Sequence, residues 1–372
     1  MVNWRELPIF AVHTSRLKMT PIRPSGTAAD VHRLPDQIFA LKANDPDFDE
    51  ICLRVFNFQA EHNPIYALFL KHLGIAPHAI RSVSQIPFLP IEFFKTHRVL
   101  SGEGSAQIVF TSSGTTGMQR SRHEVFDIDL YERSFRKTFQ CVYGDPAALT
   151  ILALLPAYLE REGSSLIYMV DDLLEQSQQA ESGYFLYDHD NLTERLLHLH
   201  RSGKKVLLLG VSFALLDYAD YLADSTHAKA ETLRAAFADF PELMIMETGG
   251  MKGRRKEMIR EELHQILKQA FHRPSIHSEY GMTELLSQAY SPGDGIFECP
   301  AWMKISLRDT NDPLSEVQPG QSGGINVIDL ANLYSCSFIA TQDLGRMHAG
   351  GRFEVLGRFD QSDIRGCNLL IG

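Results

Sequence analysis

Hydrophobic positions between about residues 105 and 290 follow two alternating periods. Short runs rich in aliphatic residues, such as QIVFT, ALTILALL, KKVLLLGV and ELMIMETGG, are each followed by a longer stretch in which apolar residues recur every three or four positions. The short runs predict buried strands, and the longer ones predict amphipathic helices. Strand and helix in repeated alternation predict an α/β fold built from layered sheets.

The segments around this region have different patterns. Residues 36–74 read as helical and end at a glycine, and SQIPFLPIEFFKTHRV reads as an extended linker with a buried apolar side. Within DNLTERLLHLHRSG, we predict a helix that begins at an Asp190 cap and stops at Gly203. After about residue 293, WMKISLRD, GGINVIDL, YSCSFIATQDLG and RFEVLGRFD predict short strands.

These patterns predict three parts of the chain. They are a loosely ordered N-terminal extension (1–35), an α/β core (36–292), and a β-rich subdomain with a C-terminal tail (293–372).

Composition narrows the class of protein. The 372 residues are 44% hydrophobic and 22% charged, which is typical of a soluble protein with a sizeable core. A net charge of −10 gives no electrostatic basis for binding nucleic acid or an anionic membrane. Five scattered cysteines favour a reducing compartment, and neither a signal-like start nor an apolar run of about 18 residues is visible. We therefore expect a cytoplasmic protein without a membrane span.

A hydroxyl-rich glycine turn follows the strand QIVFT. Its backbone amides and hydroxyls could surround phosphate oxygens, with nearby arginines supplying positive charge. The residues concerned are Ser112, Ser113, Gly114, Thr115, Thr116, Gly117, Arg120 and Arg122. The turn lacks the Gly-Lys-Ser/Thr of a Walker loop. On composition alone, an ordinary polar turn remains an equal alternative.

Four segments, in order, resemble the motifs of the adenylate-forming enzymes. SGTTG resembles their phosphate loop, and YGMTE resembles the motif that holds adenine and a magnesium-linked phosphate. TQD resembles the motif whose aspartate holds the ribose hydroxyls, and GRFD with a following Arg-Gly resembles the hinge. The motifs begin at Ser113, Tyr280, Thr341 and Gly357.

Within that superfamily, the chain resembles the LuxE-like acyl-protein synthetases of bacterial bioluminescence operons. The phrases IPFLPIEFFK, SSGTTG, GGMKGRRKEM, EYGMTELLSQAY and GRFDQSDIRGC carry the similarity, which extends over residues 34–372. It implies that ATP and Mg²⁺ are used to convert a fatty acid to an acyl-adenylate, and that a cysteine of the enzyme then takes the acyl group. It also implies a partner reductase, and a homo-oligomer or heteromeric complex.

The resemblance assigns roles to individual residues, each with a plainer alternative. Glu284 would bind magnesium or simply begin a helix, and Asp343 would hold ribose or belong to a turn. Tyr280 would stack on adenine or fill the core, and Cys367 would carry the acyl group or be a buried apolar residue. A basic group would capture anions or form a solvated helix start; it comprises Lys252, Arg254 and Arg255. The motif matches add Gly281, Thr283 and Arg358 to the nucleotide-binding set.

Several departures from the superfamily pattern matter. Gln119-Arg120 stands where Pro-Lys is usual, Gln342 replaces a glycine, and the hinge motif is one residue shorter and lacks its lysine. The sequence stops at Gly372, so we expect it to lack the large mobile C-terminal domain, as the acyl-protein synthetases do. Which cation replaces the lysine of that domain stays open.

Two other functions fit the same residues. One is a ligase of the phenylacetate type that passes the acyl group to coenzyme A or a carrier protein, and the other is a non-catalytic nucleotide-binding subunit. His123 lies just beyond the phosphate loop and could contact phosphate or an acyl carbonyl, whereas His198 and His200 lack metal-ligand spacing. The sequence does not name the acid or its pathway.

Overall fold

The computed structural model describes residues 32–102, 104–112, 119–155, 163–186, 188–224, 226–250, 255–256, 258–318 and 320–358. One sheet has the strand order β5-β4-β6-β7-β8-β9, in which all neighbours are parallel except the β8–β9 pair. Its strands are β4 (Thr150–Leu154), β5 (Gly183–Tyr184), β6 (Val206–Val211), β7 (Leu243–Thr248), β8 (His277–Tyr280) and β9 (Ala289–Ser291). Every residue of β4 and β6 is buried, because helices cover both faces of this sheet.

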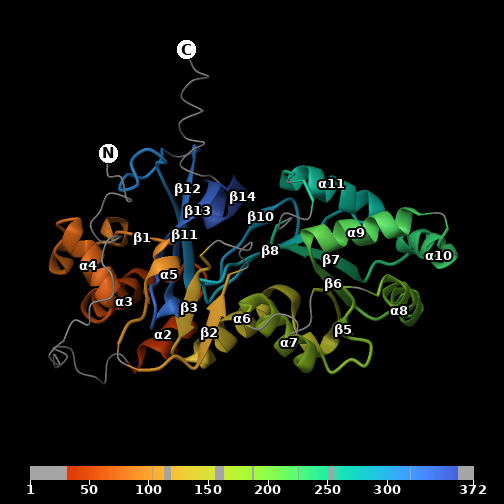
Figure 1. The fold of residues 1–372 in the computed structure, drawn as a ribbon, viewed down its shortest axis with the longest axis horizontal. Coiled ribbons are helices and arrows are strands. Elements are labelled where there is room, and N and C mark those ends of the chain that lie inside the picture. The colour runs from red at the N-terminus through yellow and green to blue at the C-terminus, as the bar shows by residue number, and fades with distance from the viewer. Residues whose placement is uncertain are drawn as a thin grey trace, which may run out of the picture.

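The helices of this layer are α6 (Ile128–Tyr143), α7 (Ser165–Ser177), α8 (His189–Ser202), α9 (Ser212–Ala223), α10 (Ala228–Phe237) and α11 (Arg260–Phe271). In Figure 1, α9 and α11 lie on one side of the sheet, and α6 and α7 lie on the other. The alternating strand and helix pattern therefore forms the α/β layers that the sequence predicts.

A second sheet contains the strands after residue 293. Its order is β10-β14-β13-β12-β11, all antiparallel, and β1 pairs in parallel with β13. The strands are β1 (Leu89–Pro90), β10 (Ile296–Phe297), β11 (Met303–Arg308), β12 (Ser322–Asp329), β13 (Phe338–Met347) and β14 (Phe353–Arg358). The fold thus combines α/β layers with a β-rich part.

A short hairpin and an N-terminal group of helices complete the described chain. Strands β2 (Ile108–Thr111) and β3 (Arg122–Val125) pair in antiparallel fashion on either side of residues 113–118, which lie outside the described residues. The helices are α2 (Leu34–Ala40), α3 (Phe48–His62), α4 (Pro64–His72) and α5 (Phe93–Thr96). Short 3₁₀ turns are η3 (Pro77–Ala79), η4 (Val83–Gln85), η5 (Pro146–Ala148), η7 (Leu330–Asn332) and η8 (Ala349–Gly351).

Some local predictions are corrected. Helix α8 is capped by Asp188, whose carboxylate accepts a hydrogen bond from the Asn191 amide at 3.0 Å, and Asp190 lies inside the helix. Gly203 ends α8 in the left-handed conformation, as predicted. The expected extended linker contains helix α5, and helix α10 was not predicted.

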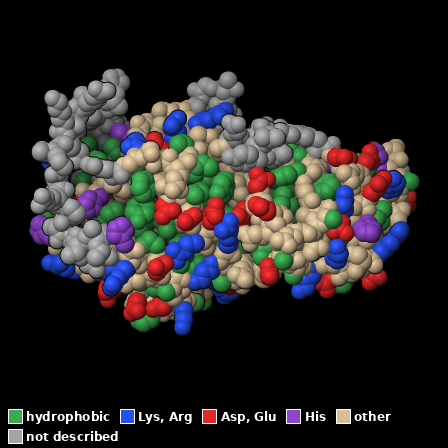
Figure 2. All heavy atoms as spheres, turned by 90° about the horizontal axis from the view of Figure 1, so that it is seen from below, with side chains coloured by type: hydrophobic (Ala, Val, Ile, Leu, Met, Phe, Trp, Pro, Cys, Tyr) green, Lys and Arg blue, Asp and Glu red, His purple; other side chains and the backbone are tan. Residues whose placement is uncertain are grey.

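The surface carries both signs of charge. Figure 2 shows one face of the molecule, on which lysine and arginine side chains are interspersed with aspartate and glutamate. Within the described ranges, no helix is both long and apolar enough to cross a lipid bilayer.

Candidate active site

The ends of β8 and β13 bring two of the predicted motifs together. Tyr280, the last residue of β8, donates a hydrogen bond through its hydroxyl to Oδ2 of Asp343 on β13, at 2.8 Å. Arg358 is the cross-strand neighbour of Asp343 on β14, and its Nε lies 3.5 Å from Asp343 Oδ1. Residues from the second, third and fourth motifs therefore meet at one carboxylate.

The environment of Asp343 contains several cations. Only 8% of this residue is exposed, and its burial raises the pKa of the carboxyl group. Arg358, the Tyr280 hydroxyl, Arg260 and Arg308 oppose that rise. A carboxylate surrounded in this way can stay ionised while it accepts hydrogen bonds from a ligand.

Arg308 is a buried arginine that the sequence did not single out. It donates through Nη1 to the Ile325 carbonyl at 2.8 Å and to Asn326 Oδ1 at 2.9 Å, and through Nη2 to the Thr341 carbonyl. A Cβ atom on Gly324 would lie 2.7 Å from the Arg308 Cζ, so glycine is needed for this approach. The bond to Thr341 holds the backbone two residues before Asp343.

The ring of Tyr280 is packed among aromatic side chains. Its centroid lies 5.5 Å from that of Phe353 in an edge-on arrangement and 5.9 Å from that of Phe297. Adenine stacking by Tyr280 therefore stays a prediction, whereas its hydroxyl has a defined partner in Asp343.

The base of the hydroxyl-rich turn is closed by two serines. The Ser112 amide donates to the Ser121 carbonyl at 3.1 Å, and the Ser121 amide donates to Ser112 Oγ at 2.9 Å. Arg120 is exposed beside them. The remaining predicted members of the turn lie outside the described residues; they are Ser113, Gly114, Thr115, Thr116 and Gly117.

Glu284 lies beside this base. It is 6% exposed, and burial raises the pKa of its carboxyl group, opposed by hydrogen bonding to Ser121 and by the charges of Arg358 and Lys95. Lys95 is on α5, within the phrase IPFLPIEFFK, and no motif marks it as a site residue. The charge of Arg358 opposes the rise in pKa of both Glu284 and Asp343.

The rest of the Tyr280 motif is also tightly placed. A Cβ atom on Gly281 would lie 2.3 Å from Glu279 Oε1, so a larger residue would displace that buried glutamate. The Thr283 carbonyl accepts a hydrogen bond from His123 Nδ1 at 2.8 Å. Asp329 accepts from the Leu286 and Ser287 amides at 2.8 and 2.9 Å, and burial raises its pKa to about 6. The segment after Glu284 is thus held by buried polar bonds.

The predicted basic group is only partly described. Lys252, Arg254 and the acyl-acceptor candidate Cys367 lie outside the described residues. Arg255 forms ion pairs with Asp217 and, at 2.6 Å, with Asp220, both on α9. The structure therefore places Arg255 against α9 rather than beside Glu284.

A buried glutamate near the end of β7 was not predicted as a site residue from the sequence. Glu247 Oε1 lies 3.2 Å from Arg260 Nε and 3.5 Å from His264 Nε2 on α11. Although burial acts to raise the pKa of Glu247, hydrogen bonding from His264 and the charge of Arg260 hold it below the usual value. Arg260 also donates to the Val355 carbonyl at 2.9 Å, which ties α11 to β14.

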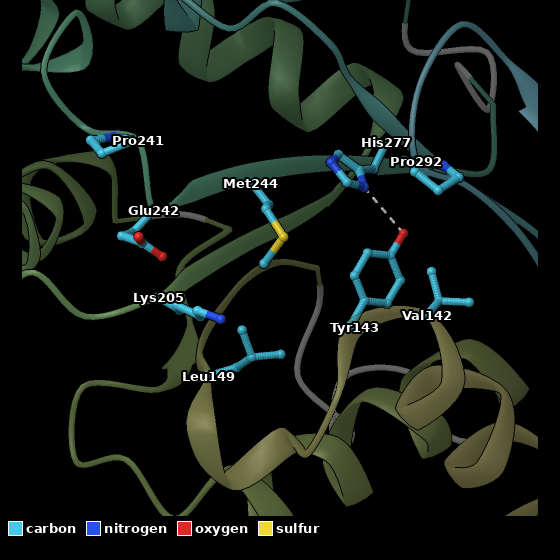
Figure 3. Close-up of a pocket in the computed structure, with 9 residues that line it drawn as sticks. All are labelled: Val142, Tyr143, Leu149, Lys205, Pro241, Glu242, Met244, His277 and Pro292. Carbon is cyan, nitrogen blue, oxygen red and sulfur yellow. Dashed lines mark hydrogen bonds between the residues drawn. The ribbon is translucent and has the colours of Figure 1, made fainter.

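Two pockets lie apart from the residues of the predicted motifs. Figure 3 shows one of about 270 Å³ near the amino ends of the parallel strands, where Tyr143 Oη and His277 Nδ1 are 3.3 Å apart. The other, of about 370 Å³, lies between α11 and β14 and includes Arg260 and Lys268. The linings of both leave out Tyr280, Glu284 and Asp343. In the parts of the chain that are described, no group of three His, Cys, Asp or Glu residues is arranged to hold a metal.

Comparison with solved structures identifies the fold. An open conformation of 2-hydroxyisobutyryl-CoA ligase in complex with 2-HIB-AMP and CoA has a TM-score of 0.60 at 13% identity, over 92% of this chain and 80% of that one. The same ligase in the postadenylation state with 2-HIB-AMP has a TM-score of 0.59 at 13% identity, over 94% of this chain and 74% of that one. The fold is therefore that of adenylate-forming ligases.

A further similar structure is an ATP-bound RpMatB-BxBclM chimera, with a TM-score of 0.50 at 15% identity over 69% of this chain. This chain spans about half of the chimera, 49% of its length. A search of curated proteins finds no match. The sequence profile of the family described as acyl-protein synthetase, LuxE, matches residues 37–372. The chain therefore belongs to the LuxE acyl-protein synthetase family.

Proposed function

We propose that this chain uses ATP to convert a fatty carboxylic acid to an acyl-adenylate and then transfers the acyl group to its own Cys367. Family membership and fold support an AMP-forming ligase. The observation that carries the proposal is the meeting of Tyr280 and Arg358 at the Asp343 carboxylate. Glu284, whose pKa is affected by Ser121 and Arg358, supports it.

The nucleotide would be oriented through its ribose. Asp343 has carboxylate oxygens that can accept hydrogen bonds from a cis-diol, and Tyr280 and Arg358 hold that carboxylate in place. Because Asp343 is 8% exposed, a hydrogen bond to it is formed largely away from water and contributes more than a surface contact would.

Adenylation joins two anions. An oxygen of the substrate carboxylate forms a bond to the α-phosphorus of ATP, the bond from that phosphorus to the bridging oxygen breaks, and pyrophosphate leaves with the electron pair. Cations must offset the repulsion. Among the described residues, Arg358 and Lys95 supply positive charge that acts on the Glu284 carboxyl group. Lys252 and Arg254 are further candidates for this role.

Glu284 suits a magnesium ion that arrives with ATP. A hard divalent cation shared with phosphates usually takes one or two protein carboxylates, and Glu284 is a buried carboxylate next to the loop base. When bound, the ion would neutralise phosphate charge and so ease attack by the substrate carboxylate. Glu284 would hold the ion, and Ser121 would orient Glu284.

Transfer to protein requires a thiolate. The Cys367 sulfur would attack the acyl carbonyl, AMP would leave with its phosphate oxygen, and a thioester would form. An ordinary thiol has a pKa of about 8.5 and is only a few per cent ionised at neutral pH, so Arg365, two positions earlier in the sequence, would assist. A reductase partner would then accept the acyl group.

The test measures transfer of a labelled acid to the protein. With ATP and labelled tetradecanoate, the wild-type protein should acquire a label that hydroxylamine removes. Cys367→Ser should lose the label and keep acid-dependent pyrophosphate exchange, whereas Cys141→Ser, at an exposed cysteine, should keep both.

Three results would contradict this proposal. Label that persists in Cys367→Ser removes the assignment of the acyl acceptor. Acyl-CoA formed at turnover rates independent of Cys367 would instead indicate a coenzyme A ligase. ATP binding without acid-dependent exchange would indicate a nucleotide-binding subunit.

A further inference from the structure

Two buried side chains hold the backbone on either side of Glu284. His123 on β3 donates through Nδ1 to the Thr283 carbonyl at 2.8 Å, and Asn332 at the end of η7 donates through Nδ2 to the Glu284 carbonyl at 2.8 Å. These two carbonyls belong to the peptide groups that flank the Glu284 Cα atom. Fixing both peptide planes fixes the backbone dihedrals of Glu284, and with them the direction in which its side chain leaves the chain.

The strand that carries His123 contacts the Glu284 turn a second time. Ser121, next to the start of β3, opposes the rise in the pKa of the Glu284 carboxyl group, while His123 bonds the preceding peptide. Ser121 also closes the base of the hydroxyl-rich turn with Ser112. Residues on or next to β3 therefore act on both the backbone and the side chain of Glu284.

The two holding residues are not ordinary core residues. His123 and Asn332 are both 0% exposed, yet His123 Nε2 and Asn332 Oδ1 have no hydrogen-bond partner among the described residues. A buried acceptor left without a partner costs about 1–3 kcal/mol. Departures of this kind from full satisfaction of polar groups are expected where function, rather than packing, determines the residue.

We propose that His123 and Asn332 are positioning residues that hold the Glu284 carboxylate in the direction in which it would meet a magnesium-linked phosphate. Neither residue needs to touch the nucleotide; both act through the peptide groups of the Thr283–Glu284 segment. The inference rests on the proposed function, because it assumes that Glu284 meets a magnesium-bound nucleotide. It predicts that affinity for ATP with magnesium depends on His123, whereas affinity for AMP without magnesium does not.

The experiment compares two substitutions of nearly equal size at His123. Asparagine keeps an N–H donor close to the position of Nδ1, and leucine removes it. Calorimetry would measure the affinity of each full-length variant for ATP with Mg²⁺ and for AMP in EDTA. We expect His123→Leu to weaken binding of ATP with Mg²⁺ by about five- to tenfold, the size of one lost hydrogen bond, with AMP affinity unchanged within about twofold. His123→Asn should stay near wild type for both ligands.

Asn332→Ala provides a second route if His123→Leu does not fold. It removes the hydrogen bond to the Glu284 carbonyl, together with one to the Cys336 carbonyl, and should show the same selective loss. Equal binding by His123→Leu and His123→Asn, or parallel losses for both ligands, would overturn the inference. Failure of the wild-type protein to bind either nucleotide would instead overturn the proposed function, so the two failures are distinguishable.

Discussion

The buried imidazole of His123 makes acid stability a quantitative test of the structure. Burial lowers its pKa to about 4, while the hydrogen bond to the Thr283 carbonyl opposes the shift only in part. In the unfolded chain the pKa would be about 6.5. Because the folded state binds the proton less well, stability is present above pH 6.5 and is lost as the pH falls toward 4. Between pH 7 and pH 5, this one group should reduce the free energy of unfolding by about 2 kcal/mol.

The assay is chemical denaturation of wild type and His123→Asn at both pH values. Asparagine does not titrate and keeps the donor, so the difference between the two pH-dependent losses isolates the imidazole from every other ionisable group. We expect wild type to lose about 2 kcal/mol more than the variant on going from pH 7 to pH 5. Equal losses in the two proteins would show that His123 is not held neutral in the fold, and would refute the reasoning.

Two other substitutions test the surroundings of the carboxylate. Gly324→Ala would place a Cβ atom 2.7 Å from the Arg308 Cζ and should lower the free energy of unfolding by about 1–3 kcal/mol in a denaturant titration. Gly250→Ala is the control, because a Cβ atom there meets nothing within 4 Å. It should change the free energy of unfolding by under about 0.5 kcal/mol. Tyr280→Phe removes the hydrogen bond that lowers the pKa of Asp343, so calorimetry should show ATP affinity falling about tenfold at pH 7 and further at pH 6; unchanged affinity at both would exclude this role.

The order of elements was predictable because burial leaves a periodic signal. Strands covered on both faces, such as Val206–Val211, are continuous apolar runs, and their connecting helices are amphipathic. The start of α8 was predicted at an Asp190 cap, whereas the helix is capped by Asp188, two residues earlier. Tertiary contacts determine which aspartate caps the helix. Asp188 accepts a hydrogen bond from the Asn191 amide, while Asp190 accepts one from Tyr221 on another helix.

The site was predictable only where a motif marks it. The resemblance assigns Tyr280 and Asp343 to motifs that hold the adenine and the ribose of one nucleotide, and a hydrogen bond joins the two side chains. Arg308 and Asn332 carry no local signal, since their roles depend on strand pairing and on a turn far away in the sequence. Arg255 lay in a basic run, but its partners are carboxylates one turn apart on α9, which become visible only in three dimensions.

The central claim, that one nucleotide binds between Asp343 and the Glu284 turn, is tested most directly by removing the ribose hydroxyls. Affinities for ATP and for 2′,3′-dideoxy-ATP would be measured with wild type and with Asp343→Asn. We predict that wild type prefers ATP by about tenfold or more, the size of a hydrogen bond to a charged group, and that Asp343→Asn loses most of this preference. Equal affinity of the wild-type protein for the two nucleotides would contradict the account.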